Sequence, residues 1–214
     1  KLLDRFELEK KLKIKINKKN ILVSYHPETL NLKSSKKVFL EILKSFQNLK
    51  ETNIIFTMPN SDEGSEIIYN LIKKFVKKNK NAFLFKNLGQ LNYLSAIKNL
   101  DVLIGNTSSG IIEAASFYKP VVNIGNRQLG RLQNKNVINC NIGNIELSIS
   151  KSISNSFLQI CHDVKNIYGD GDSAEKIVKV LSKTSLSVNK KFIDIWEFVD
   201  MLKDLGGLKY KSKE

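Results

Sequence analysis

A short turn in the middle of the chain carries the residue types that best suit an anionic ligand. An apolar run ends at Ile104 and is followed by Gly-Asn-Thr-Ser-Ser-Gly at 105–110 and then by a helical stretch. In a strand–turn–helix, unpaired N–H groups and the positive helix end point toward one spot, and the hydroxyls of Thr107, Ser108 and Ser109 add donors. This predicts a diphosphate site that needs no metal. The same pattern also fits a plain helix start, with Thr107 or Ser108 as the N-cap and Gly110 permitting close packing.

Three charged residues nearby suit the rest of such a ligand. Glu113 lies about one turn into the helix, where its carboxylate can accept from both hydroxyls of a ribose. The alternative for Glu113 is a favourable charge near the helix start. Arg127 and Arg131 follow the apolar run 121–124, a position that suits recognition of a phosphate or carboxylate. Alternatively, one of them caps helix carbonyls and the other is solvated.

His26 directly follows the first apolar run, before a proline. It is a candidate general acid or base, or a hydrogen-bond partner of a phosphate; the alternative is a structural histidine. We interpret His162, inside a predicted helix, as structural. The Gly/Asp-rich segment 168–172 is interpreted as a turn, and neither it nor Cys140 and Cys161 has the spacing of a metal site. We therefore expect no metal.

The elements that position these residues alternate along the chain. Apolar runs typical of buried strands occupy 21–23, 54–56, 83–85, 102–104, 121–124 and 137–138. Helical patterns cover 2–12, 36–49, 63–78, 90–98, 109–117, 153–164 and 173–181. This alternation predicts an α/β fold, a Rossmann-like, doubly wound parallel sheet with ligands at the carboxyl ends of its strands. The expected organisation is an N-terminal helix at 1–19, a nucleotide-binding domain at 20–184 and a C-terminal tail with a helix at 185–214.

Composition narrows the class of protein. The formal net charge of +14 favours a polyanionic partner. Almost all of this charge is lysine spread over helix surfaces, which argues against nucleic-acid recognition. The sequence contains no run of 18 apolar residues and no apolar signal-peptide core near Lys1, so we expect a cytosolic protein without a membrane partner.

Four motifs in order resemble one enzyme family. They are His26-Pro27, the turn at 105–110 with Glu113, the segment 125–131 with its two arginines, and Tyr168-Gly169-Asp170-Gly171. Together they resemble the hydrolysing UDP-N-acetylglucosamine 2-epimerases of sialic-acid and related nonulosonic-acid synthesis, over roughly residues 20–181. The non-hydrolysing relatives carry arginines after that histidine, whereas Pro27-Glu28-Thr29 follows here and favours the hydrolysing branch.

The resemblance implies one half of a two-domain, glycosyltransferase-B-type enzyme with its active site between the domains. A preceding domain, absent from this sequence, would carry the acidic residues that handle the C2 proton, and the full-length enzyme would be a homo-oligomer. The product would be N-acetylmannosamine with UDP, formed through a glycal without a cofactor. By resemblance, Thr107, Ser108, Ser109 and Gly110 hold the diphosphate, Glu113 the ribose and Arg127 the UDP. Asn87 and Leu88 present backbone groups to the base, and His26 takes part in catalysis.

Three other interpretations stay open. The same chemistry can act on UDP- or GDP-linked N,N'-diacetylbacillosamine. A glycosyltransferase of the same architecture would share this nucleotide-binding half. A basic, non-enzymatic module that binds nucleic acid is the third, and steep salt dependence of its binding would identify it.

Overall fold

The structure is a computed structural model that describes residues 1–28, 32–47, 49 and 51–185. It divides into two compact units, residues 1–170 and 171–214. In the described part of the second unit the single regular element is α8 (Ser173–Leu181), as predicted. The C-terminal tail expected from residue 185 onward, including Trp196, lies outside the described residues beyond Ser185 itself.

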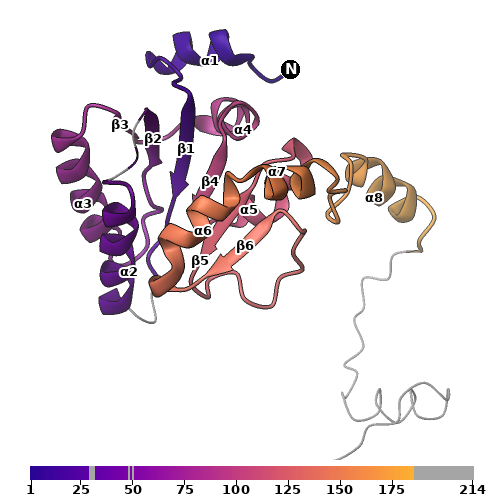
Figure 1. Ribbon diagram of the computed structural model, residues 1–214. Helices are drawn as coiled ribbons and strands as arrows, with labels where there is room; N and C mark the ends of the chain where they lie inside the picture. The colour runs from indigo at the N-terminus through magenta and orange to yellow at the C-terminus, as the bar shows by residue number, and fades with distance from the viewer. Residues whose placement is uncertain (29–31, 48, 50, 186–214) are drawn as a thin grey trace, which may run out of the picture. The chain divides into compact units, whose positions relative to one another are not determined.

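Six parallel strands form the sheet of the first unit, in the order β3-β2-β1-β4-β5-β6 (Figure 1). They are β1 (Lys19–Ser24), β2 (Thr52–Thr57), β3 (Ala82–Phe85), β4 (Val102–Gly105), β5 (Val121–Ile124) and β6 (Val137–Cys140). All six predicted strand segments are confirmed. In register, Ile21 of β1 lies beside Ile54 of β2 and Val102 of β4. The order and direction are those of a doubly wound Rossmann-like sheet.

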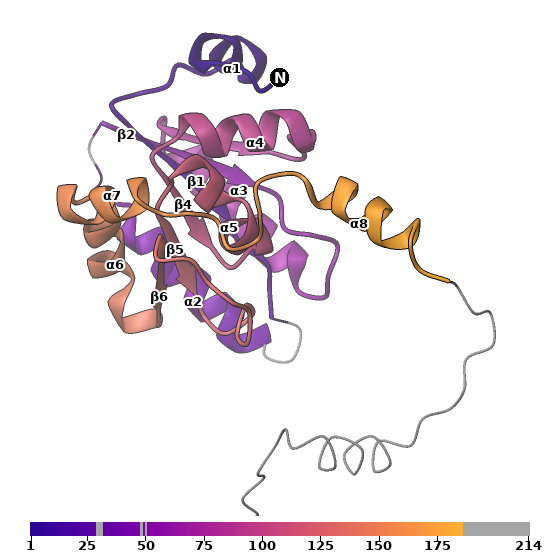
Figure 2. The same cartoon turned by 90° about the vertical axis from the view of Figure 1, so that its right-hand side faces the viewer.

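Successive side chains of each strand face opposite sides of the sheet, and helices cover both. Ile21 and Val23 pack with α2 (Leu32–Ser45), α3 (Ser65–Lys78) and α6 (Ile145–Ser152). Leu22 faces the other way, toward α1 (Arg5–Leu12) and α4 (Gly89–Asn99). Figure 2 shows α1 and α4 on one side of the sheet and α2 and α6 on the other. The central strands are therefore buried on both faces, which explains their continuous apolar sequence.

Three helical segments differ from the sequence-based prediction. The predicted helix 36–49 is α2, which begins and ends four residues earlier, at Leu32 and Ser45. The predicted helix 109–117 consists of the five-residue α5 (Ser108–Ile112) and the 3₁₀ turn η2 (Ala114–Phe117), which ends at Tyr118 with φ of 57°. The predicted helix 153–164 is α7 (Asn155–His162), which begins at Ser154, whose hydroxyl accepts the Phe157 N–H. The helix α6 before it, and the short 3₁₀ turn η3 (Ile142–Asn144), were not predicted.

No helix among the described residues is long and apolar enough to cross a membrane.

Candidate functional site

The strand order reverses at β1, because the chain first adds β2 and β3 on one side and then crosses to β4 on the other. In open parallel sheets, ligands bind beyond the carboxyl ends of the strands at this switch point. Gly105 ends β4 there with φ of +144°, and a Cβ atom at this position would lie 1.9 Å from the Ser24 carbonyl oxygen. Glycine is therefore required for β4 to lie this close to the end of β1.

A cavity of about 600 Å³ lies at this edge of the sheet, lined by residues at or after the ends of β1, β2, β3 and β4. Five predicted site residues line it: His26, Asn87, Leu88, Thr107 and Ser109. The other four, Ser108, Gly110, Glu113 and Arg127, are not among the lining residues. None of the described lining residues is acidic, and the lining includes Lys86. The cavity therefore suits an anionic ligand.

His26 is held at both its backbone and its ring. Its N–H donates to Asn106 Oδ1 and its carbonyl accepts from Asn106 Nδ2, both at 2.8 Å. The backbone N–H of Asn60 donates to His26 Nδ1 at 3.1 Å. Because a backbone N–H only donates, Nδ1 is unprotonated and the neutral ring carries its proton on Nε2. Nε2 has no hydrogen-bond partner within the described part of the chain.

The surroundings of His26 also oppose its protonation. Burial, and then the nearby charge of Arg127, lower the pKa of His26 from 6.5 to about 4, whereas Asp62 acts in the opposite direction. At neutral pH the imidazole is therefore uncharged. A neutral Nε2–H group suits hydrogen-bond donation to an anionic or carbonyl oxygen better than general-base catalysis.

Hydroxyl groups form a short chain across the cavity wall. Thr107 Oγ1 lies 3.1 Å from Ser109 Oγ, which lies 2.7 Å from the Tyr93 hydroxyl. Tyr93 comes from α4, and burial is the main cause of its raised pKa. Thr107 occupies the N-cap position of α5, but its hydroxyl caps no N–H group. The alternative prediction, that the Thr107 hydroxyl caps the helix, is therefore wrong.

The backbone of the turn offers donors, although the helix behind it is short. Ser108 and Ser109 have N–H groups without an acceptor among the described residues, as expected for the first turn of a helix. Since α5 has only five residues, its dipole contributes less than a long helix would. The local N–H and hydroxyl groups, rather than the dipole, make this turn attractive to an anion. Gly110 is buried, and a Cβ there would lie 3.0 Å from Val121 Cγ1, which favours the close-packing interpretation for it.

Glu113 is not among the residues that line the cavity. It is half-buried at the end of α5, and burial raises its pKa. Its charge contributes to the raised pKa of Tyr93, so the two groups are within electrostatic reach of each other. The side chain of Leu88 is buried in the core. The contact of its backbone with a base stays a prediction.

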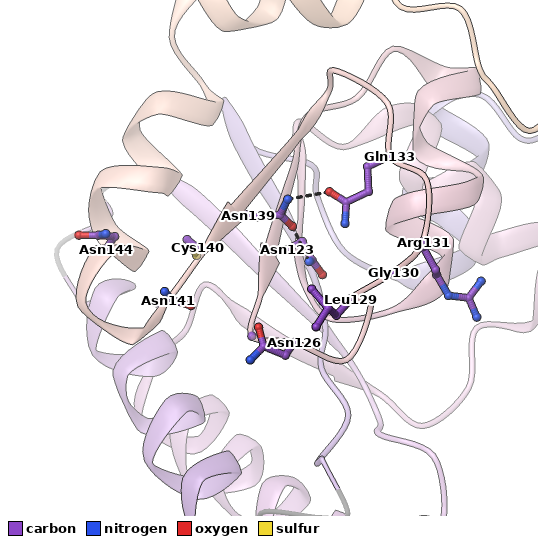
Figure 3. A pocket seen from close by; sticks show the side chains of 11 residues that line it. Asn123, Asn126, Leu129, Gly130, Arg131, Gln133, Asn139, Cys140, Asn141 and Asn144 are labelled. Atoms are coloured by element: carbon purple, nitrogen blue, oxygen red, sulfur yellow. Dashed lines mark hydrogen bonds between the residues drawn. The ribbon is translucent and has the colours of Figure 1, made fainter. Parts of the chain in front are cut away.

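The two arginines of the β5 loop have different surroundings. Arg127 Nη1 donates to the Asn106 carbonyl at 3.2 Å, beside the His26 loop. Arg131 lines a separate cavity of about 420 Å³ (Figure 3). In that cavity the amides of Asn123, Asn139 and Gln133 are hydrogen-bonded in series, and Figure 3 shows the Arg131 side chain directed away from them. Arg127 is therefore the arginine associated with the switch point.

Sequence reasoning missed four residues of this site: Asn60, Tyr93, Asn106 and Gln128. Asn60 follows β2, at a loop that the switch-point rule does indicate. Asn106 lies inside the 105–110 turn that the sequence predicts as the diphosphate site, but its side chain is directed to the backbone of His26. No local pattern distinguishes Tyr93 from an aromatic residue of a helix face. Among the described residues, no group of three or more metal-ligating side chains occurs.

Comparison with known proteins identifies the family of this chain. A family profile described as UDP-N-acetylglucosamine 2-epimerase matches residues 2–182. The chain belongs to this family. The chain is 39% identical to the GDP/UDP-N,N'-diacetylbacillosamine 2-epimerase (hydrolyzing) of Campylobacter jejuni over 197 residues, which are 90% of this chain and 51% of that protein. It thus spans about half the length of the relative.

Solved structures agree on the fold. The UDP-GlcNAc 2-epimerase of Neisseria meningitidis, bound to UDP-GlcNAc, has a TM-score of 0.61 at 18% identity, over 84% of this chain and 48% of that one. The C-terminal domain of a group 1 glycosyltransferase from Francisella tularensis has a TM-score of 0.53 at 14% identity, over 85% of this chain and 94% of that domain. The epimerase family chain described here thus has the fold of one half of a glycosyltransferase-B-type enzyme.

Proposed function

We propose that this chain is the nucleotide-binding half of a hydrolysing UDP-sugar 2-epimerase. The observation that carries the proposal is the cavity at the switch point, whose described lining is rich in donors and lacks any carboxylate. Such a lining suits a diphosphate, because N–H and O–H groups fixed in place stabilise negative charge. The family to which the chain belongs, and the relative named as a hydrolysing epimerase, support the same reaction.

In the proposed reaction, a base removes the C2 proton of the sugar while the C1–O bond breaks and UDP leaves with the bonding electrons. The product of this elimination is a 2-acetamidoglycal. Water then adds at C1, and C2 is protonated from the opposite face, giving the free 2-epimeric sugar and UDP. Atoms and charge balance without a redox partner. Donors at the diphosphate lower the barrier as its oxygens gain charge, each contributing about 3 kcal/mol.

The residues of the turn take the diphosphate in this proposal. The N–H and hydroxyl groups of Thr107, Ser108 and Ser109, with Gly110 at the turn's end, surround it, and Arg127 adds a positive charge. Glu113 accepts from the ribose hydroxyls. The backbone at Asn87 and Leu88 contacts the base. The cavity wall shared by Asn87, Leu88, Thr107 and Ser109 supports the base and diphosphate assignments. The contact of Arg127 with Asn106, beside the His26 loop, supports its role. Ser108, Gly110 and Glu113 adjoin this wall in sequence and are assigned by the family resemblance.

His26 acts in this proposal as a donor from Nε2 to the sugar or the leaving diphosphate. Its uncharged ring, with Nδ1 occupied by the Asn60 N–H, supports this role over proton abstraction. The base that removes the C2 proton then belongs to another part of the protein. This agrees with the predicted preceding domain, which, with the homo-oligomer and a cytosolic location, is part of the proposal.

Two sugars fit the proposal. UDP-N-acetylglucosamine is the substrate predicted from the sequence, and the 39% identical relative is named for GDP/UDP-linked N,N'-diacetylbacillosamine. The test is to incubate the full-length protein with each sugar nucleotide and to measure UDP and free sugar. Release of UDP with an equal amount of the free 2-epimer, without an acceptor, supports the proposal, and the better substrate is identified by kcat/KM. If UDP is released only when an acceptor is present, the protein is a glycosyltransferase instead.

A further inference from the structure

Asn106 connects the loops that form the site. It is fully buried, at 0% exposure, directly after the close contact between Gly105 and Ser24. Its side chain makes two hydrogen bonds of 2.8 Å to the backbone of His26, one on each side of that residue's Cα atom. Its own carbonyl accepts from Arg127 Nη1 at 3.2 Å and from Gln128 Nε2 at 2.8 Å.

The chemistry of these contacts specifies asparagine. One end of the side chain must accept an N–H and the other must donate to a carbonyl, and a carboxamide of this length does both. Aspartate keeps the acceptor but loses the donor, and it adds a charge in a buried place, which is unfavourable. Serine is too short to reach both groups. Two positions that are 80 residues apart in sequence are thus fixed to each other by one amide.

The same residue determines where two functional groups lie. Through its side chain Asn106 fixes the backbone from which the His26 ring extends, and through its carbonyl it orients the Arg127 guanidinium. Asn60 then fixes the ring itself. We propose that Asn106 is a positioning residue that holds His26 in the cavity wall and Arg127 beside it, so that both act on the same bound sugar nucleotide. This inference rests on the proposed function.

A purely structural role would also make Asn106 sensitive to mutation, and Asn136 provides the matched control. Asn136 is equally buried, at 0% exposure, and its Nδ2 donates to the Lys119 carbonyl at 2.7 Å. It lies before β6, at the opposite edge of the sheet from the site. Asn106→Asp and Asn136→Asp therefore introduce the same chemical change and each remove one buried hydrogen bond to a backbone carbonyl.

The experiment measures kcat, KM and thermal unfolding of the full-length protein with its sugar nucleotide. We expect Asn106→Asp to lower kcat about a hundredfold, since small displacements of reacting groups have effects of this size, with KM changed far less. Asn136→Asp should lower the unfolding temperature similarly and leave kcat within about threefold of wild type. Equal effects of the two variants on kcat would overturn the positioning role.

A double-mutant cycle tests whether Asn106 acts through His26. In a His26→Ala background, Asn106→Asp should lower kcat much less than it does in wild type, because the group that it positions is gone. Additive losses would overturn the proposal. If Asn106→Asp does not fold, Asn106→Ser takes its place in the same cycle. If the wild-type protein releases no UDP, the proposed function fails, and the same cycle is then measured as UDP affinity, where additivity again rejects the positioning role.

Discussion

The protonation of His26 is set by a backbone group. Asn60 directs its N–H at Nδ1, so protonating the ring requires that this hydrogen bond be lost. Burial and Arg127 act in the same direction. The histidine that the sequence presents as an acid or base is therefore better suited to be a neutral donor, and this difference has consequences for both stability and catalysis.

His26 should make the folded protein sensitive to mild acid. Its folded pKa of about 4 lies below the ordinary 6.5, so the unfolded chain binds the proton first, and stability falls as the pH drops from 6.5 toward 4. Between pH 7 and pH 5 we expect wild type to lose about 2 kcal/mol more than His26→Gln. Urea unfolding at the two pH values measures this. Parallel losses in both proteins would show that His26 is not held neutral.

The proposed contact of Glu113 with the ribose should be visible in UDP binding. We expect Glu113→Ala to weaken UDP binding about tenfold, because two hydrogen bonds to a carboxylate are lost. Glu146→Ala, on an exposed glutamate of α6, is the control and should bind like wild type. Calorimetry with UDP and 2'-deoxy-UDP sharpens the test. If wild type prefers UDP and Glu113→Ala does not, Glu113 contacts the 2'-hydroxyl; an unchanged preference in the variant contradicts the assignment.

At the level of elements, the close approach of β1 and β4 depends on one glycine. Gly105→Ala places a methyl group 1.9 Å from the Ser24 carbonyl oxygen, in a backbone region that L-residues rarely adopt. We expect a loss of more than about 4 kcal/mol of folding free energy, or no soluble protein. Gly143→Ala, with open space around it, should be tolerated. Similar denaturation midpoints for the two variants would show that the strand ends can move apart.

The strands were predictable because each is a continuous apolar run buried on both faces, such as 54–56 in β2. The interruption between α5 and η2 was not, since the helix ends where the chain must turn back into β5. Within the site, the residue types of the 105–110 turn were informative. The Tyr93–Ser109 contact and the Asn60–His26 contact join residues from different elements, so they exist only after the sheet is assembled. Local sequence patterns therefore predict which loops form the site better than they predict which side chains contact one another.

At the scale of the whole molecule, we expect this chain to bind a sugar nucleotide without catalysing its hydrolysis. We expect the 214-residue chain alone to bind UDP saturably and to release no UDP from a sugar nucleotide, because the described cavity lining contains no carboxylate. Calorimetry and a UDP-release assay measure the two properties. Turnover by the chain alone would contradict the proposed need for a second domain. Binding to DNA that is stronger than to UDP and falls steeply with salt would favour the nucleic-acid alternative instead.

The donor-rich, carboxylate-free cavity lining has a consequence for timing. Under the proposed function, a sugar nucleotide can stay bound to this half without reacting. The diphosphate is held, but the described lining supplies no carboxylate to abstract a proton from the sugar carbon. The reaction begins only when the proposed second domain closes over the bound substrate and brings the base to it. Substrate binding and domain closure are then separate steps, and closure of the two domains without a bound substrate has no chemical result.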